Sequence, residues 1–294
     1  MALREWLLLI LLSLVWGSSF VFVEVALEGF LPLTLVFFRL AIATLTLALI
    51  CLVQKKSLPS RWQDWLPFVV LALLNNVIPF SLIVWRQTHI SAGLASILNG
   101  MTPIFTVLLA NWLTRDESLS FQKLLGVLLG FAGVVVLIGP GALQGLSWQE
   151  LGQFTVMGAA CSYAFAALYG KRFRGRSPVV ISACTVTAAA AMMLPLSWAI
   201  ERPQLSLVDS ASWWAVIALG TACTGLAYLI YYHILTFAGA TSAALVTFLI
   251  PPSALLLGAV FLNESIAWNG LLGLGAILGG LTLINWRGTV KNPG

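Results

Sequence analysis

The sequence is a succession of apolar runs, each about twenty residues long, joined by short polar connections. A helix needs about 20 apolar residues to cross the hydrocarbon core of a membrane, where the backbone must satisfy its own hydrogen bonds. Only 9% of the residues are charged, whereas soluble domains carry roughly 25%. Since so few charges cannot cover a water-exposed surface, the sequence predicts an all-α membrane protein embedded in a lipid bilayer.

Ten transmembrane helices are expected where apolar runs lie between clusters of charged and turn residues. In the first half they are Trp6–Ala26, Pro32–Val53, Trp65–Trp85, Ser91–Leu113 and Gln122–Gly139. In the second half they are Leu151–Gly170, Pro178–Ile200, Trp213–Leu235, Thr241–Leu262 and Asn269–Trp286. The connections between these spans are short, which predicts a compact helical bundle.

The basic residues indicate the orientation of the bundle, because Lys and Arg gather in cytoplasmic loops. With the N-terminus inside, the outer connections contain only Arg86 and Arg202. The inner segments contain Arg4, Lys55, Lys56, Arg61, Arg115, Lys123, Lys171, Arg172, Arg174, Arg176, Arg287 and Lys291. This asymmetry predicts that both termini are cytoplasmic, in a bacterial-type inner membrane.

The chain resembles itself at an offset of about 147 residues. The matches are Glu117-Ser118 with Glu264-Ser265, Leu124-Leu125-Gly126 with Leu271-Leu272-Gly273, Gly133 with Gly280, and Pro103 with Pro251 within one residue. A unit of five spans crosses the membrane an odd number of times, so two tandem copies must be inverted relative to each other. We expect one repeat at 1–140, an inverted repeat at 148–287 and a cytoplasmic tail at 288–294. Inverted repeats are common in secondary transporters.

Several motifs resemble the EamA family of the drug/metabolite transporter superfamily. They are Trp16-Gly17-Ser18-Ser19-Phe20, Phe37-Phe38-Arg39, the stretch Ser91–Asn99 that leads to Thr102-Pro103, the Glu117 loop, and Leu124-Leu125-Gly126-Val127. The resemblance covers both halves and is greatest for YddG-type amino-acid exporters. It implies a ten-span inverted-repeat fold with a central cavity lined mainly by spans 1, 3, 4, 6, 8 and 9. The family often has Lys late in span 1, where this chain has Glu24.

Polar and aromatic residues near the middle of the spans are the first candidates for a substrate site. Trp16 is the one tryptophan away from span ends and loops, and Ser19 adds polarity at a similar depth. Asn76 and Asn99 are mid-membrane amides, and Phe80 lies four residues after Asn76 on one predicted helical face. Polar groups in hydrocarbon are costly unless they face protein or a wet cavity. Each of these residues could instead join two helices.

Prolines and tyrosines supply the second group of candidates. Pro103 and Pro251 interrupt corresponding spans, and each proline should free carbonyls one turn earlier, near Asn99 and Thr247. Matched breaks of this kind indicate a transporter site, although proline kinks are also common in membrane helices. Three further residues are predicted to line the cavity, with packing as the alternative: Tyr163, Thr224 and Tyr228.

Glu24 and Arg39 are the only ionisable residues clearly inside the spans. We expect them to form a structural ion pair, since intramembrane charges usually pair. The alternative is that Arg39 extends to the headgroups or takes part in transport. With these two residues assigned to a pair, the inferred cavity carries amides, hydroxyls and aromatic rings but no deep charge.

These features favour a secondary carrier working by alternating access over other functions. The expected substrate is an exported amino acid, including aromatic and other neutral ones, or a similar metabolite; nucleosides or sugars are the alternative. An intramembrane enzyme would need a catalytic motif, and neither His-Glu-x-x-His nor Gly-x-Ser-x-Gly occurs. A pore would need charged rings or a filter loop. We expect no metal, no cofactor, no nucleic acid and a monomer.

Overall fold

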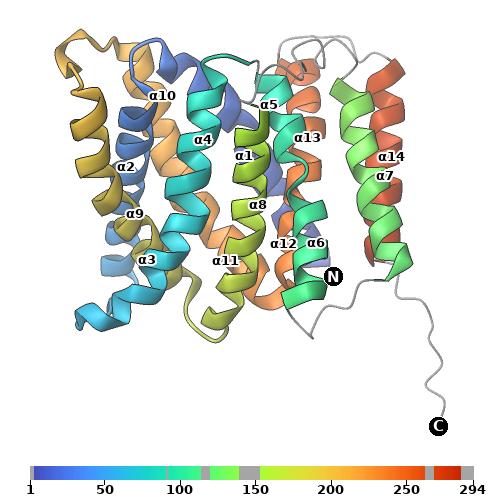
Figure 1. Cartoon of the computed structure of the whole chain (residues 1–294), viewed down its shortest axis with the longest axis horizontal. Coiled ribbons are helices and arrows are strands. Elements are labelled where there is room, and N and C mark those ends of the chain that lie inside the picture. The colour runs from blue at the N-terminus through green and yellow to red at the C-terminus, as the bar shows by residue number, and fades with distance from the viewer. Residues whose placement is uncertain (1–2, 91, 114–119, 139–152, 262–267, 286–294) are drawn as a thin grey trace.

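The structure is a computed structural model that describes residues 3–90, 92–113, 120–138, 153–261 and 268–285. Within these residues every regular element is helical and no strand occurs. Six stretches are long and apolar enough to cross a membrane: Leu3–Leu27, Pro32–Val53, Trp62–Gln87, Ala95–Leu113, Pro178–Glu201 and Ser210–Ala238. Shorter apolar helices complete the bundle of ten spans that the sequence predicted (Figure 1).

The helices of the first half match the predicted spans closely. They are α1 (Leu3–Leu27), α2 (Pro32–Val53), the 3₁₀ turn η1 (Trp62–Trp65), α3 (Leu66–Ala72), the π-helical turn η2 (Leu73–Val77), α4 (Ile78–Gln87), α5 (Ala92–Asn99), α6 (Thr102–Leu113) and α7 (Phe121–Ile138). The third span is thus one continuous run from α3 through η2 to α4. The fourth span is divided into α5 and α6.

The second half repeats this plan. Its elements are α8 (Gln153–Gly170), the 3₁₀ turn η4 (Lys171–Phe173), α9 (Pro178–Glu201), the 3₁₀ turn η5 (Leu205–Leu207), α10 (Ser210–Gly220), the π-helical turn η6 (Thr221–Leu226), α11 (Ala227–Ala238), α12 (Ala240–Ala244), α13 (Val246–Phe261) and α14 (Trp268–Asn285). Some predicted positions lie outside the described residues: Ser91, Arg115, Glu117, Ser118, Gly139, Leu151, Leu262, Glu264, Ser265, Trp286, Arg287 and the tail at 288–294.

The packing of the helices follows the two inverted repeats. Span 2 packs on span 7 through α2 and α9, and span 5 packs on span 10 through α7 and α14. The contact of α1 with α13 has its counterpart in that of α8 with α6. The contact of α1 with α11 corresponds to that of α8 with α4, and the contact of α1 with η6 corresponds to that of α8 with η2. The main contacts between the halves therefore occur in matching pairs, as two inverted copies require.

Glycines set the close approach of α7 and α14, which stand together at one side of the bundle (Figure 1). A Cβ atom on Gly126 would lie 2.7 Å from the Gly280 oxygen, and one on Gly133 would lie 2.8 Å from the Gly273 oxygen. Small residues allow membrane helices to approach this closely. Gly126 matches Gly273 and Gly133 matches Gly280 in the repeat, so the two contacts are exchanged by the pseudo-twofold symmetry.

The helical irregularities also occur at matching positions. Both π turns, η2 and η6, lie in the middle of the third span of their half. The fourth spans are interrupted between α5 and α6, at Gly100 and Met101, and between α12 and α13, at Leu245. The sequence placed the second interruption at Pro251, which is wrong, because Pro251 lies inside the continuous helix α13. Pro103 lies in the first turn of α6, where a missing N–H costs little.

Candidate functional site

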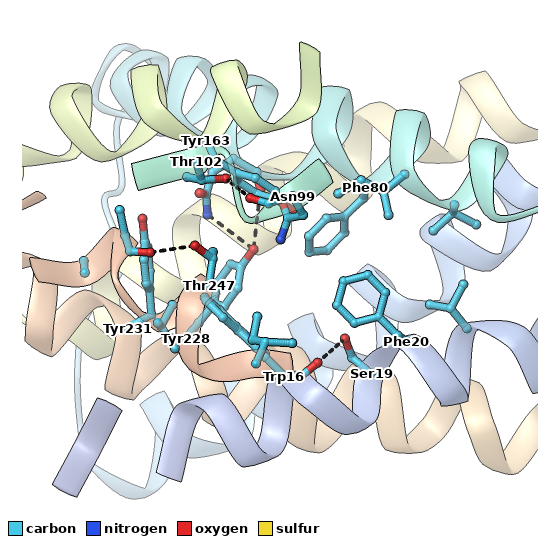
Figure 2. Close-up of a pocket in the computed structure, with 18 of the residues that line it drawn as sticks. Trp16, Ser19, Phe20, Phe80, Asn99, Thr102, Tyr163, Tyr228, Tyr231 and Thr247 are labelled. Atoms are coloured by element: carbon cyan, nitrogen blue, oxygen red, sulfur yellow. Dashed lines mark hydrogen bonds between the residues drawn. The ribbon is translucent and has the colours of Figure 1, made fainter. Parts of the chain in front are cut away.

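A cavity is lined by residues of the central helices of the bundle. Figure 1 shows α1, α5, α6, α8 and α13 between α2 and α9 on one side and α7 and α14 on the other. The volume of the cavity is about 90 Å³, which is room for several water molecules. Its wall comes from spans 1, 3, 4, 6, 8 and 9, together with one residue of span 2. Figure 2 shows Trp16, Ser19 and Phe20 from α1 facing Asn99, Thr102 and Tyr163 across this space.

The two π turns shape the wall by releasing backbone carbonyls in the middle of the membrane. In η2 the Ile78 N–H bonds to the oxygen of Leu73, five residues back, and Pro79 has no N–H to offer Leu74. The Leu74 carbonyl accepts instead from the Ser162 hydroxyl at 2.7 Å. In η6 the Cys223 carbonyl accepts from Trp16 Nε1 at 2.9 Å. Each π turn is therefore stabilised by the first span of the other half.

The helix interruptions release carbonyls that threonine hydroxyls take up. Thr102 Oγ1 donates to the Asn99 oxygen at 2.7 Å, and Thr247 Oγ1 donates to the Ala244 oxygen at 2.9 Å. Thr102, Asn99, Thr247 and Ala244 all line the cavity. Since their own hydroxyls occupy these carbonyls, the interruptions add few free acceptors to the wall.

Tyr228 is the centre of a buried polar network. Its hydroxyl accepts from Asn76 Nδ2 at 2.8 Å and from Asn75 Nδ2 at 3.3 Å. Asn75 Nδ2 also lies 3.3 Å from the Tyr232 hydroxyl. The Trp16 ring packs on the rings of Tyr228 and Tyr231, with centroids 6.4 and 5.5 Å away. This network joins spans 1, 3 and 8 on one side of the cavity.

Arg39 in α2 is the span-2 residue in the wall, and it is 6% exposed. Its Nε donates to Thr224 Oγ1 at 2.8 Å, and its guanidinium carbon lies 4.1 Å from the centre of the Phe80 ring. Gly220 brings η6 to this position, because a Cβ there would lie 2.9 Å from the Arg39 oxygen. Bonds from the Leu33 and Thr34 amides to Glu201 hold the start of α2 against α9.

The predicted ion pair between Glu24 and Arg39 is therefore wrong for the described structure. The Glu24 side chain is exposed on the outside of α1, whereas Arg39 points into the bundle and contacts Thr224 and Phe80. The expectation of a cavity without deep charge fails for the same reason. Arg39 is the one charged residue among the described residues that line it.

The structure brings most of the predicted site residues together. Those that line the cavity are Trp16, Ser19, Phe80, Asn99, Tyr163, Tyr228 and Thr247. Four others lie behind the wall: Asn76, Pro103, Thr224 and Pro251. Asn76 is 0% exposed because its amide turns toward Tyr228, and Thr224 is occupied by Arg39.

Sequence reasoning missed other wall residues, including Phe20, Asn75, Gln87, Thr102 and Tyr231. Asn75 was not among the predicted site residues, since the extra residue of a π turn is not visible in apolar periodicity. Thr102 had a usable signal, because a hydroxyl next to Pro103 can take the carbonyl that the proline leaves free. Gln87, the last residue of α4, extends the wall toward the face where α1 ends.

The comparisons with known proteins agree with this architecture. The sequence pattern of the EamA-like transporter family matches this chain twice, over residues 3–139 and 150–286, with one match in each half. The chain belongs to the EamA-like transporter family. As a transporter of this family it spans the membrane several times and has a small molecule as its substrate.

Relatives of this family member cover nearly the whole chain. The Uncharacterized transporter YoaV of Bacillus subtilis (strain 168) is 25% identical over 90% of this chain and 91% of its own length. An Uncharacterized transporter of Archaeoglobus fulgidus is 24% identical over 96% of this chain and 99% of its own. A crystal structure that is 19% identical superposes with a TM-score of 0.78 over 96% of this chain and 98% of its own length, which shows a shared fold.

Proposed function

We propose that this protein is a secondary carrier that exports amino acids or similar small metabolites by alternating access. The observation that most directly supports this proposal is the position of the cavity. It lies where the π turns and helix interruptions of both inverted repeats meet. Sites at the interface of inverted repeats, beside discontinuous helices, are typical of secondary transporters. Two repeats that each contribute one wall can rock against each other and open the cavity to either face in turn.

The chemistry of the wall supports a small polar substrate with an apolar part. Trp16, Phe20, Phe80 and Tyr231 offer aromatic surface, while Asn99 and the tyrosine hydroxyls offer hydrogen bonds. Pockets of this composition bind small molecules through apolar contact and obtain orientation from a few polar groups. Asn76, Thr224, Pro103 and Pro251 act from behind the wall, where they hold its shape. We expect the monomer to be the working unit.

The export direction rests on the orientation inferred from the charges. Cytoplasmic termini place the side at which α1 and α4 end outside the cell, and the cavity wall reaches that side at Gln87. A substrate bound among Trp16, Asn99 and Tyr163 could then leave along α1 and α4. The opposite opening, between the cytoplasmic ends of the same spans, would load it.

Reconstituted liposomes test this function directly. We expect uptake of some members of a labelled panel of amino acids, nucleosides and sugars, and preloading with the unlabelled substrate should accelerate it. Asn99→Ala should lose most of the flux, whereas Asn269→Ala, the same truncation on α14 outside the wall, should keep it. Absence of flux for the entire panel, with folded protein present, would contradict the carrier assignment. Equal flux in both variants would remove Asn99 from the site.

A further inference from the structure

The cavity wall contains a buried cation without a buried anion. The guanidinium of Arg39 faces the cavity, and its one hydrogen bond among the described residues is the Nε contact with Thr224. Thr224 and the Phe80 ring are neutral, so they hold the group in place without balancing its charge. No Asp or Glu occurs among the described residues of the wall, and Glu24 is exposed on the outer surface of α1.

A buried charge without a partner is costly, because desolvation removes its hydration and nothing replaces it. Water that enters the cavity can hydrate Arg39, but a bound substrate with an apolar body would expel that water. A carboxylate can replace it, because its two oxygens match the fork of guanidinium donors and cancel the charge. Binding of a neutral molecule would instead leave the guanidinium dry and unpaired.

The other polar groups of the wall also favour a ligand that accepts hydrogen bonds. The carbonyls of Asn99, Ala244 and Cys223 are already occupied by Thr102, Thr247 and Trp16. The hydroxyls of Tyr163 and Tyr231 have no hydrogen-bond partner in the part of the chain that the structure describes, so they can donate to a ligand. Two amide oxygens of the wall, on Asn99 and Gln87, have no partner there. Each can accept one N–H of a substrate, but no acidic group occurs among the described wall residues to bind an ammonium strongly.

From this arrangement we propose that the cavity selects small organic carboxylates, with the carboxylate docked on Arg39 and the apolar body against Trp16 and Phe20. The amino group of an amino acid is then an accessory that Asn99 can accept, and it is not required. This proposal rests on the proposed carrier function and specifies the substrate class of that same site. Arg39 becomes the residue that determines specificity.

Four compounds that share a phenyl group test the contributions of the carboxylate and the amino group separately. They are phenylalanine, 3-phenylpropanoate, phenylalaninamide and phenethylamine. Equilibrium binding to the purified wild-type protein in nanodiscs is measured first. The two carboxylates should bind at least about tenfold more tightly than the amide and the amine. This comparison uses one protein, so it does not depend on whether any variant folds. Equal or tighter binding of the amide or the amine, or no binding of either carboxylate, would overturn the proposal.

Variants then assign the preference to Arg39. Arg39→Gln should lower carboxylate affinity about tenfold or more and leave the amide unchanged, while Arg39→Lys should retain part of the preference. If Arg39→Gln keeps the full preference for carboxylates, Arg39 is not the docking group. Flux is measured in parallel: carboxylate binding without flux would reject the carrier function and leave the inference standing. Equal flux of phenethylamine and phenylalanine would reject the inference and leave the carrier.

Discussion

The contact of α7 with α14 makes a quantitative prediction about Gly280. A Cβ atom there would lie 2.5 Å from the Gly126 oxygen and 2.6 Å from the Gly130 nitrogen, both backbone atoms. Backbone cannot rotate away as a side chain can, so Gly280→Ala must push the two helices apart. The same helix provides a matched control, because a Cβ on Gly275 would meet no atom within 4 Å.

The expected difference in stability follows from these two environments. Overpacking typically costs about 1–3 kcal/mol, and in Gly280→Ala this cost opposes the gain in helix preference that alanine brings. Alanine is favoured over glycine in a helix by about 1 kcal/mol, so Gly275→Ala should be neutral or slightly stabilising. Because both glycines lie in α14, this helix preference is common to both variants, and they should differ by the overpacking cost of about 1–3 kcal/mol. Gly279→Ala should resemble the control, since its nearest atom would be Leu129 Cδ2 at 3.5 Å.

Reversible unfolding in bicelles with increasing dodecyl sulfate measures these differences. Because α7 and α14 stand beside the cavity and contribute no described residue to its wall, flux per folded molecule should be unchanged in all three variants. If Gly280→Ala unfolds at the same detergent fraction as Gly275→Ala, the helices do not meet at the glycines. The packing that defines the pseudo-twofold symmetry would then have to be revised.

Two further predictions address the polar network and the orientation. Tyr228→Phe leaves the amides of Asn75 and Asn76 without their shared acceptor and should cost about 0.6–1.7 kcal/mol of unfolding free energy, the range measured for polar contacts between membrane helices. Tyr231→Phe should lower the free energy of unfolding by less than this, because the Tyr231 hydroxyl has no described partner. Equal losses of unfolding free energy for the two variants, measured by unfolding in bicelles, would refute the network. Cysteines introduced at 55–61 and 171–176 should react with impermeant maleimide only after cells are permeabilised; labelling of either loop in intact cells would invert the topology.

The sequence was sufficient for the spans and the repeat because both depend on features that recur along the chain. Apolar length alone determines where a helix can cross a bilayer, so predicted and observed spans agree within a few residues for α1, α2 and α9. The repeat was visible through Gly126, Gly133, Gly273 and Gly280, whose spacing reappears as helix contacts. These glycines allow close helix contact because they have no side chain, a property that is known from the residue type alone.

Two errors at the site, on the third span of each half, share one cause, the π turns. The sequence grouped Asn76 with Phe80, four residues apart, as neighbours on one face of an α-helix. The π turn at Leu73–Val77 inserts a residue, so Asn75, five residues before Phe80, shares its face on the cavity. The same shift in η6 separates Thr224, which turns to Arg39, from Tyr228, which lines the cavity.

Arg39 illustrates a second limit, which is that sequence does not reveal which neighbour a helical face meets. Its charge within a span suggested a partner of opposite sign, and Glu24 was the one candidate in the spans. Its actual partner, Thr224, is 185 positions away and reaches it only because Gly220 lets α10 approach α2. The residue was thus correctly identified as unusual, but its partner and its role depend on tertiary packing.

The hydrogen bonds of the π turns show that each half of the protein stabilises the part of the cavity wall that the other half forms. The Leu74 carbonyl is satisfied by Ser162 from the second half, and the Cys223 carbonyl by Trp16 from the first. In a membrane an unpaired carbonyl costs several kcal/mol, so these bonds from the other half stabilise both π turns at this depth. Because these turns place Asn75 and Tyr228 in the wall and bring Thr224 to Arg39, the site can exist only where the repeats meet. Any motion that opens the cavity toward the opposite face must therefore preserve these two bonds or supply new donors to the same carbonyls.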